Sequence, residues 1–314
     1  MFNYLLTVSI FIFTSSSSFS QDIKRATQIK NDDQSTHEIL SYRLTQFATH
    51  IDGFFSDDSQ LNFENKTRIR ILHDTFFQED KKKIELASVQ LQLKLPRIQK
   101  KLQFILERDS DQNEDDTNSN IIGITPVRIP EKNNTRAGFR YFLDLQDIKT
   151  TFGSGIIFRN IRPILFTRFR VRKNIHYKYW LFKPEQEINW VDKQGIRSRT
   201  ELDFDHKIND YLLIRLVNNI SWNDTDHEIK SRNGPSLYQK INEKIGMSYN
   251  ARMISSDTPS LSTNNYSISI GYRQLLYKRW LFWTISPSLD FPRHKNFRRS
   301  PNINIRFEAI IGYI

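Results

Sequence analysis

The sequence contains no cysteine among its 314 residues. This absence excludes a disulfide scaffold, a cysteine-ligated metal centre and a cysteine nucleophile. After residue 20 no stretch approaches the roughly 18 consecutive apolar residues of a membrane-spanning helix, so a helical membrane protein is excluded as well. The sequence also has no glycine-rich phosphate loop and no Gly-x-Ser-x-Gly elbow, and its histidines are scattered without metal-ligand spacing. We therefore expect no cofactor and no metal.

Aromatic residues, in contrast, are abundant. They make up 13% of the chain, with 23 Phe, 12 Tyr and 5 Trp. The net charge is +11, yet so many aromatic side chains are not typical of a disordered polycation and favour a β-rich fold.

The first twenty residues have the pattern of an export signal. Leu5 to Phe13 are almost continuously apolar, and the small residues Ser18 and Ser20 predict signal-peptidase cleavage after Ser20. The apolar stretch is too short for a permanent anchor, and a buried N-terminal strand is the alternative reading. Export of a chain without cysteine favours a bacterial periplasm or outer membrane.

Residues 21–64 form a segment with more acidic than basic side chains. Its first part is polar, and helical spacing of apolar residues begins after Thr36, a candidate N-cap, and ends near Gly53. We predict one amphipathic helix over residues 36–55, in the periplasm beneath or partly inside a larger structure.

From residue 65 to 314 apolar residues recur with a period of two. Val89, Leu91, Leu93 and Leu95 alternate with polar residues, and Tyr266, Ile268, Ile270 and Tyr272 do the same. The alternation extends over about 9–13 residues, the length with which a tilted strand crosses a bilayer, and aromatic residues recur near the strand ends. The pattern predicts an all-β, antiparallel transmembrane β-barrel. A water-soluble sandwich is the alternative, but its strands usually have about 5–6 residues.

The links between these segments give the strand count. Short links such as Lys207–Asp210 and Asn242–Glu243 alternate with links expected to be longer, such as Gln78–Lys83, Asp109–Thr135 and Asp192–Gly195. Short periplasmic turns and longer outer loops are usual in outer-membrane barrels. The count is 14 strands, with 12 as the alternative, because the stretch from Phe139 to Phe169 is difficult to divide.

The chain resembles the uncharacterised exported β-barrel proteins of the Gram-negative outer membrane. The resemblance covers about Lys66 to Ile314 and rests on the following features: the Leu93-Lys94-Leu95-Pro96-Arg97 turn, Thr151–Phe158, Arg197–Phe204, Leu237-Tyr238-Gln239, Tyr266–Arg273, Phe291-Pro292-Arg293 and the last strand. The resemblance implies a barrel in contact with outer-membrane lipid and lipopolysaccharide, and it supplies no catalytic residues. It also implies insertion by the barrel-assembly machinery, which reads a terminal aromatic residue; here Tyr313 is penultimate.

Charged residues on the predicted strands must face the lumen, because Arg or Lys facing lipid at mid-bilayer costs about 2–4 kcal/mol. The candidates for the lumen lining are Arg168, Arg170, Arg172, Arg197, Arg199, Glu201, Asp203 and Asp205. They form either a packed interior of paired arginines and carboxylates or a cationic lining that selects anions. Nucleic-acid binding would suit the basic balance, but export argues against it.

Catalysis is the least favoured interpretation. His227, Ser231 and Asn233 would share one face of a strand, and a Ser–His pair can activate a hydroxyl. Outer-membrane lipid hydrolases, however, have a tighter His-x-Ser-Asn spacing. We therefore expect no enzyme but a narrow, partly plugged pore for small anionic solutes. The alternatives are a structural or surface-interaction barrel with a filled lumen and, last, a lipid-modifying hydrolase.

Overall fold

Antiparallel strands dominate the structure, a computed structural model that describes residues 42–52, 54–55, 66–79, 81–95, 101–110, 133–145, 148–159, 162–258, 260–278 and 280–312. The strands and one short 3-10 helix are β1 (Arg68–Gln78), β2 (Lys81–Lys94), β3 (Leu102–Ser110), β4 (Asn133–Leu145), β5 (Ile148–Arg159), β6 (Arg162–Lys173), β7 (Ile175–Tyr177), β8 (Trp180–Val191), β9 (Gly195–Lys207), β10 (Leu212–Asn223), β11 (Ile229–Lys240), β12 (Ile245–Ser256), β13 (Ser262–Tyr277), β14 (Leu281–Pro292), η2 (Arg293–Lys295) and β15 (Ser300–Gly312).

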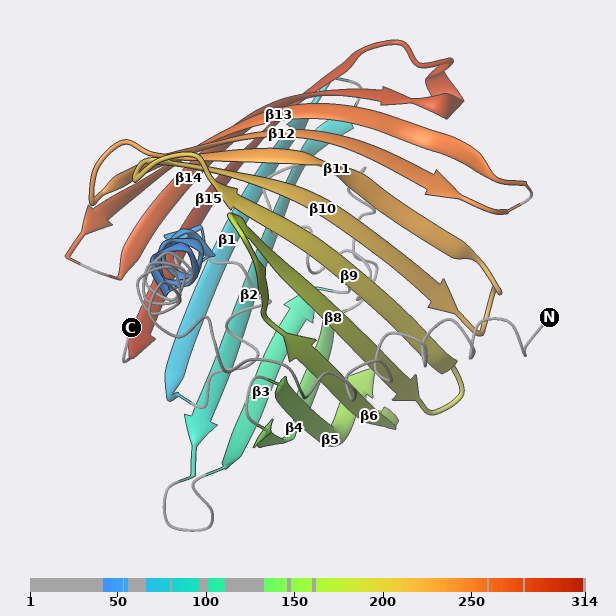
Figure 1. Cartoon of the computed structure of the whole chain (residues 1–314). Helices are drawn as coiled ribbons and strands as arrows, with labels where there is room; N and C mark the ends of the chain where they lie inside the picture. Colours follow the sequence, from blue (N-terminus) through green and yellow to red (C-terminus); the bar gives the residue numbers. More distant parts are fainter. Residues whose placement is uncertain are drawn as a thin grey trace, which may run out of the picture. The chain divides into compact units, whose positions relative to one another are not determined.

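The sheet closes on itself. Strands that follow one another in sequence pair, except β6 and β7; β1 also pairs with β15, and β6 pairs with β8. The three-residue β7 continues β6 beyond Asn174 and pairs with β8 as well, so β6 and β7 count as one strand of a 14-stranded ring. The red strands of the C-terminus therefore lie beside the blue β1 in Figure 1. The predicted antiparallel barrel of 12–14 strands is confirmed, and the larger count is correct.

The difficult stretch between Phe139 and Phe169 contains parts of three strands, β4, β5 and β6. Gly138 and Gly155 are paired across β4 and β5. A Cβ on Gly155 would lie 2.1 Å from the carbonyl oxygen of Ala137, so glycine permits a close approach of the two backbones. These glycines interrupt the apolar alternation, which is why the sequence pattern alone does not separate the strands.

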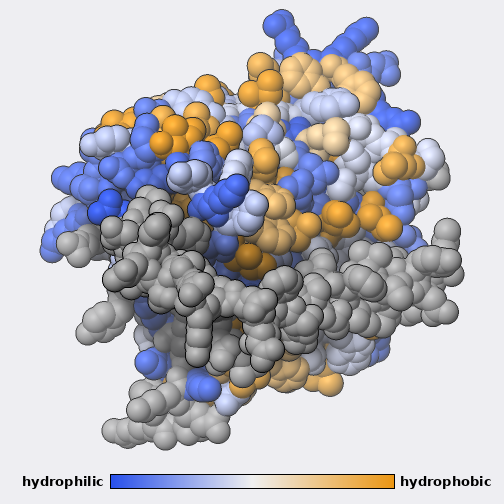
Figure 2. Space-filling model, viewed as in Figure 1, coloured by the Kyte–Doolittle hydropathy of each residue, from blue (hydrophilic) through white to orange (hydrophobic). Residues whose placement is uncertain are grey.

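Polarity is inverted relative to a water-soluble barrel. The alternating positions buried on the inner face are mostly charged or polar, as with Lys183, Glu185, Glu187 and Asn189 of β8. Large apolar side chains occupy the outer face. Exposed examples are Ile71, Val89, Phe139, Phe152, Leu165, Phe169, Ile188, Leu216, Ile220, Ile268, Ile270, Leu289, Ile303 and Phe307. Figure 2 shows hydrophobic side chains distributed over the visible face.

The two ends of the barrel differ. We call the end at which β1 begins and β15 ends the terminal end; the links after β2, β4, β7, β9, β11 and β13 also lie there. At the opposite end the links expected to be long at Gln78–Lys83 and Asp192–Gly195 are tight turns, because Gln78 pairs with Lys81 and Val191 with Gly195. The structure does not describe residues 111–132, which make up most of the longest link.

One helix accompanies the barrel. Residues 42–52 are helical, whereas the first residues of the predicted helix 36–55 lie outside the described residues, as do the export signal and the predicted cleavage after Ser20. Figure 1 draws the helix as the blue coil near the C-terminal end of β15. No helix within the described ranges is long and apolar enough to cross a bilayer.

Candidate functional site

The helix packs an apolar face against the inner wall near the terminal end. Its spacing of i, i+4, i+7 and i+11 places four side chains on one stripe. The buried cluster consists of Leu44, Ala48, Ile51 and Phe55 from this segment and Leu181, Leu213 and Tyr238 from β8, β10 and β11. Complete burial of a large apolar side chain contributes about 1.5–3 kcal/mol, so the cluster holds the helix firmly against the wall.

Two aromatic residues follow the helix and extend this contact to β12 and β14. The Phe55 ring lies 5.1 Å from the ring of Tyr238, and the Phe54 ring lies 6.1 Å from that of Phe282. Gly246 of β12 lies beneath both phenylalanines. A Cβ there would meet Phe54 Cε1 at 2.7 Å and Phe55 Cζ at 2.9 Å, so the absence of a side chain admits the aromatic pair.

A charged cluster lies under the end of the helix. Asp52 accepts a hydrogen bond of 2.6 Å from an Arg215 Nη atom and one of 3.1 Å from Lys183 Nζ. Asp205 accepts from Arg215 Nε at 2.6 Å and lies 2.8 Å from Lys183 Nζ, while Asp203 lies 3.7 Å from Arg215 Nε. All five side chains are at most 3% exposed. Lys183 of β8 and Arg215 of β10 thus each bind both Asp52 of the helix and Asp205 of β9. These contacts connect the helix to the wall.

The ionisation of Asp52 follows from these contacts. Burial alone would raise the pKa of its carboxyl, but the adjacent Arg215 and Lys183 outweigh burial and hold the pKa below the ordinary value. A carboxylate with a depressed pKa contributes stability above its unfolded-state pKa and loses it only as the pH falls through the lower folded value. The contact between Asp52 and the wall therefore persists into mildly acidic solution.

A second set of charges lines the wall formed by β6, β8 and β9. Arg170 donates from Nε to Glu187 at 2.6 Å and lies 3.3 Å from Glu185. Arg172 pairs with Glu185 at 2.5 Å, and Arg168 lies 3.7 Å from Glu187. On β9 the Arg199 guanidinium donates to Glu201 at 2.5 Å. Arginines and carboxylates thus alternate across three neighbouring strands.

A third set joins the first and last strands of the barrel. Glu308 of β15 accepts from Arg70 of β1 at 2.5 Å and from Arg273 of β13 at 2.6 Å. Asp74 accepts from Arg306 Nε at 2.7 Å. The Arg70–Glu308 and Asp74–Arg306 pairs cross the seam at which β1 meets β15, so they reinforce its backbone ladder on the lumen side.

The predicted lumen residues all belong to β6 and β9. Buried among them are Arg170, Arg172, Glu201, Asp203 and Asp205, and partly exposed are Arg168, Arg197 and Arg199. Arg168, Arg170 and Arg172 contact β8 carboxylates, and Asp203 and Asp205 contact the cluster of Asp52, whereas Arg197 lies at the opposite end of β9 beside Gln194. Seven of the eight residues therefore divide between two charged sets, and Arg197 belongs to neither.

Sequence reasoning missed the residues that receive the helix. Lys183, Leu181 and Leu213 lie on the inner face, and Asp52 lies on the helix. The signal was present, because Leu181 and Lys183 share the alternation of Glu185 and Glu187. What could not be foreseen was that an apolar residue on the lumen face, such as Leu213, would have an apolar partner there.

Charges are balanced in the buried interior. Among the described residues, the buried cations Arg68, Arg70, Arg140, Arg170, Arg172, Lys183, Arg215, Arg252 and Arg273 equal in number the buried carboxylates Asp52, Asp74, Glu185, Glu187, Glu201, Asp203, Asp205, Asp290 and Glu308. Partly exposed Arg168, Arg197, Arg199 and Arg306 add positive charge to these. The equal numbers allow the buried cations and carboxylates to pair with one another. The four partly exposed arginines give the lining a surplus of positive charge.

The proposed catalytic spacing does not form a strand face. His227 lies in the turn between β10 and β11 with a φ of +53°, whereas Ser231 and Asn233 lie within β11. No hydrogen bond joins His227 to Ser231 among the described residues. Among all the residues that the structure describes, no group of three or more His, Asp or Glu side chains is placed to hold a metal ion.

No protein-family model and no curated protein sequence matches this chain. Solved structures that it resembles include a loop-deletion form of OmpT, an outer membrane protein of Vibrio cholerae, at 10% identity and a TM-score of 0.46 over 78% of this chain and 98% of that one. A bacterial polysaccharide outer membrane secretin matches at 9% identity and 0.46 over 80% and 99%, and the outer membrane channel DcaP of Acinetobacter baumannii at 8% and 0.44 over 78% and 96%. These scores are too low to carry an argument about function.

Proposed function

We propose that the chain is an integral β-barrel of a bacterial outer membrane that gives small, polar, preferentially anionic solutes a narrow path, partly plugged by its N-terminal helix. The observation that carries this proposal is the inverted polarity of a closed barrel. Charged residues buried inside and large apolar residues exposed outside have the distribution that a bilayer selects.

The export signal and the strand lengths support the location. Strands of 12 or 13 residues, such as β8 and β9, are long enough to span the apolar core of a bilayer when tilted. In this location the terminal end faces the periplasm. Contact with membrane lipid and lipopolysaccharide, and insertion by the assembly machinery, belong to the same proposal.

The position of the helix supports the proposal that it partly plugs the lumen. It is attached to β8, β10 and β11 through the apolar cluster and through Asp52, near the terminal end. Side chains alone can fill the interior of an eight-stranded barrel, but a 14-stranded barrel is wider. A helix of about 10 Å diameter narrows such a lumen without filling it.

Anion preference rests on the partly exposed arginines. Arg168, Arg197 and Arg199 add positive charge to an otherwise balanced lining. A passing anion meets these guanidinium groups because they are partly exposed, although Arg168 also lies near Glu187 and Arg199 also binds Glu201. We therefore expect a slight rather than a strong preference for anions.

Membrane fractionation tests the location. Expressed in a Gram-negative host, the full chain should be recovered in the outer membrane and should migrate faster on gels before heating than after it. Recovery as a soluble periplasmic protein without heat-modifiable mobility would contradict the barrel's membrane role.

Planar-bilayer recording tests the pore. The purified protein should give small, weakly anion-selective conductance, and a variant lacking residues 21–60 should assemble and conduct more. A truncated form as silent as the full chain would instead favour a structural or interaction barrel with a filled lumen. The dense arginine–carboxylate pairing on β6, β8 and β9 is the observation that favours this second candidate.

A further inference from the structure

Two turns at the terminal end share the sequence Tyr-Lys-x-Trp, at residues 177–180 and 277–280. In both turns the lysine has a positive φ, +53° for Lys178 and +46° for Lys278. In both, the lysine Nζ lies over the ring of the preceding tyrosine, at 5.6 Å and 5.3 Å. The tryptophans are equally exposed, at 37% for Trp180 and 36% for Trp280. The turns are thus matched in sequence and local conformation.

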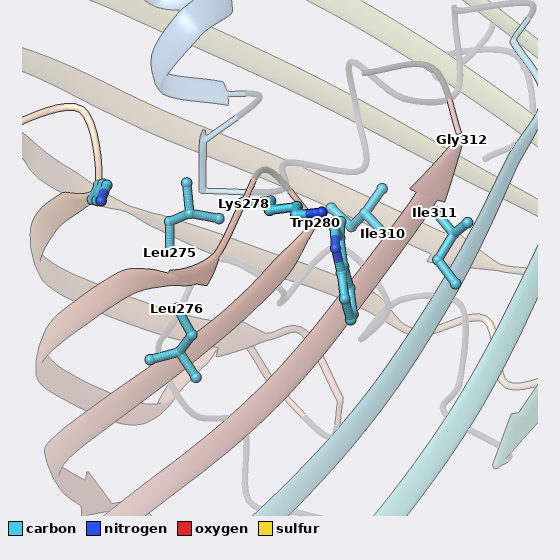
Figure 3. A pocket seen from close by; sticks show the side chains of 8 residues that line it. Leu275, Leu276, Lys278, Trp280, Ile310, Ile311 and Gly312 are labelled. Atoms are coloured by element: carbon cyan, nitrogen blue, oxygen red, sulfur yellow. The ribbon is translucent and has the colours of Figure 1, made fainter.

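The second turn opens on a cavity. A cavity of about 810 Å³ lies at the rim of the barrel where β13 and β15 end and β14 begins, and Lys244, Leu275, Leu276, Lys278, Trp280 and Ile311 are among the residues that line it. In Figure 3, Trp280 lies between the leucines of the β13 end and the isoleucines of β15. Trp180 instead stacks on His206 at 4.8 Å between ring centroids.

The cavity joins an apolar surface to positive charge. Leu276 and Ile311 are 46% and 50% exposed, and they continue the outer apolar face of the barrel to its rim. Lys244 and Lys278 form no ion pair with any described residue, whereas the nearby turn lysines Lys207 and Lys240 are bound by Asp210 and Glu243. Two available ammonium groups beside an apolar hollow match a ligand with an anionic head and a hydrocarbon chain.

We propose that this rim cavity binds one anionic phospholipid of the bilayer leaflet at the terminal end. The phosphate lies against Lys244 and Lys278, and one acyl chain lies in the hollow between Leu276, Trp280 and Ile311. Tryptophan and tyrosine rings occupy the level of lipid headgroups, and lysines there attract anionic lipid. This inference rests on the proposed membrane location.

Quenching of tryptophan fluorescence by brominated lipid measures occupancy at this position. The full chain and the Trp280→Phe variant are inserted in phosphatidylcholine vesicles that contain either brominated phosphatidylglycerol or brominated phosphatidylcholine at equal mole fraction. The difference between the two proteins isolates the signal of Trp280. We expect phosphatidylglycerol to quench it with about thirtyfold higher apparent affinity, because each of the two nearby lysines contributes a factor of about five.

Matched variants identify the lysines. Lys244→Gln together with Lys278→Gln should abolish the preference for phosphatidylglycerol at Trp280, while Lys178→Gln should leave it unchanged. Trp180, isolated by Trp180→Phe, serves as the control tryptophan and should be quenched equally by both lipids, because its ring packs on His206 and does not line the cavity at Trp280.

The outcomes separate the two proposals. Equal quenching of Trp280 by both brominated lipids would overturn the lipid site and leave the membrane location intact. Stronger quenching by a brominated fatty acid than by phosphatidylglycerol would overturn the phospholipid as the occupant. An absence of quenching at both tryptophans by any brominated lipid would overturn the membrane location and the site with it.

Discussion

Asp52 connects the helix to the barrel by charge. Its carboxylate is fully buried and accepts hydrogen bonds from Arg215 and Lys183, which also bind Asp205. Removing one partner of a buried ion pair commonly costs about 3–5 kcal/mol, because the remaining charge stays desolvated. Here Asp205 stays in place, so both cations keep a partner and the loss should be smaller.

We therefore expect Asp52→Asn to loosen the helix without unfolding the barrel. The variant should keep its heat-modifiable mobility, while its N-terminal segment becomes more sensitive to added protease and its conductance rises. Asp210→Asn is the matched control, since Asp210 binds Lys207 at an exposed position where ion pairs contribute about 0–1 kcal/mol. Equal protease sensitivity of the two variants would show that Asp52 does not hold the helix.

At the scale of elements, the helix and β12 approach closely because Gly246 has no side chain. We expect Gly246→Val to displace Phe54 and Phe55 and to raise conductance, the same direction as we expect for the deletion of residues 21–60. Gly153→Ala is the control, because its Cβ would meet its nearest neighbour, the carbonyl oxygen of Phe139, at an ordinary 3.5 Å. Unchanged conductance in Gly246→Val would place the restriction of the lumen elsewhere.

Successive side chains of a strand lie on opposite faces of the barrel wall, and the two faces have different surroundings. Ile268 of β13 is 56% exposed on the outer face, while the adjacent Ser269 is 3% exposed on the inner face. Ile268→Arg should lower the free energy of unfolding from vesicles by about 2–4 kcal/mol if this position lies near the bilayer centre. Urea titration of vesicle-inserted protein measures it, with Ser269→Ala as the inner-face comparison. A change below about 0.5 kcal/mol in Ile268→Arg would mean that lipid does not contact this face.

At the scale of the whole molecule, the ring of strands is continuous because β6, which β7 prolongs, pairs with β8. Phe169 of β6 pairs with Ile188 of β8, and both side chains are exposed on the outer face. Because the chain has no cysteine, Phe169→Cys with Ile188→Cys should form a disulfide on oxidation, seen as a mobility shift that reductant reverses.

Leu165→Cys with Ile188→Cys is the control for this closure. Leu165 lies on the same face of β6 but four residues from Phe169, about 13 Å along the strand, so no disulfide should form. Efficient cross-linking of the control pair, or none in the Phe169 pair, would contradict the register of the closing strands.

The order of the residues is sufficient to predict the class of fold. A period of two over strand-length segments fixes which side chains share a face, and the cost of charge in hydrocarbon decides which face is inside, so the antiparallel barrel and the inner position of Arg170, Glu201 and Asp205 follow from residue order alone. The count of 14 strands was less certain because the glycines paired across β4 and β5 break the apolar pattern.

Only the tertiary structure decided which charges meet and where the helix lies. Arg170 and Glu187 are adjacent because β6 pairs with β8 in one register, and Asp52 reaches Arg215 across 163 residues of sequence. Period and composition contain no information about such contacts, since any inward arginine could pair with several inward carboxylates. The apolar side chains of Leu181 and Leu213 lie on an otherwise charged wall because Ile51 and Phe55 pack against them, and the sequence alone does not show this contact.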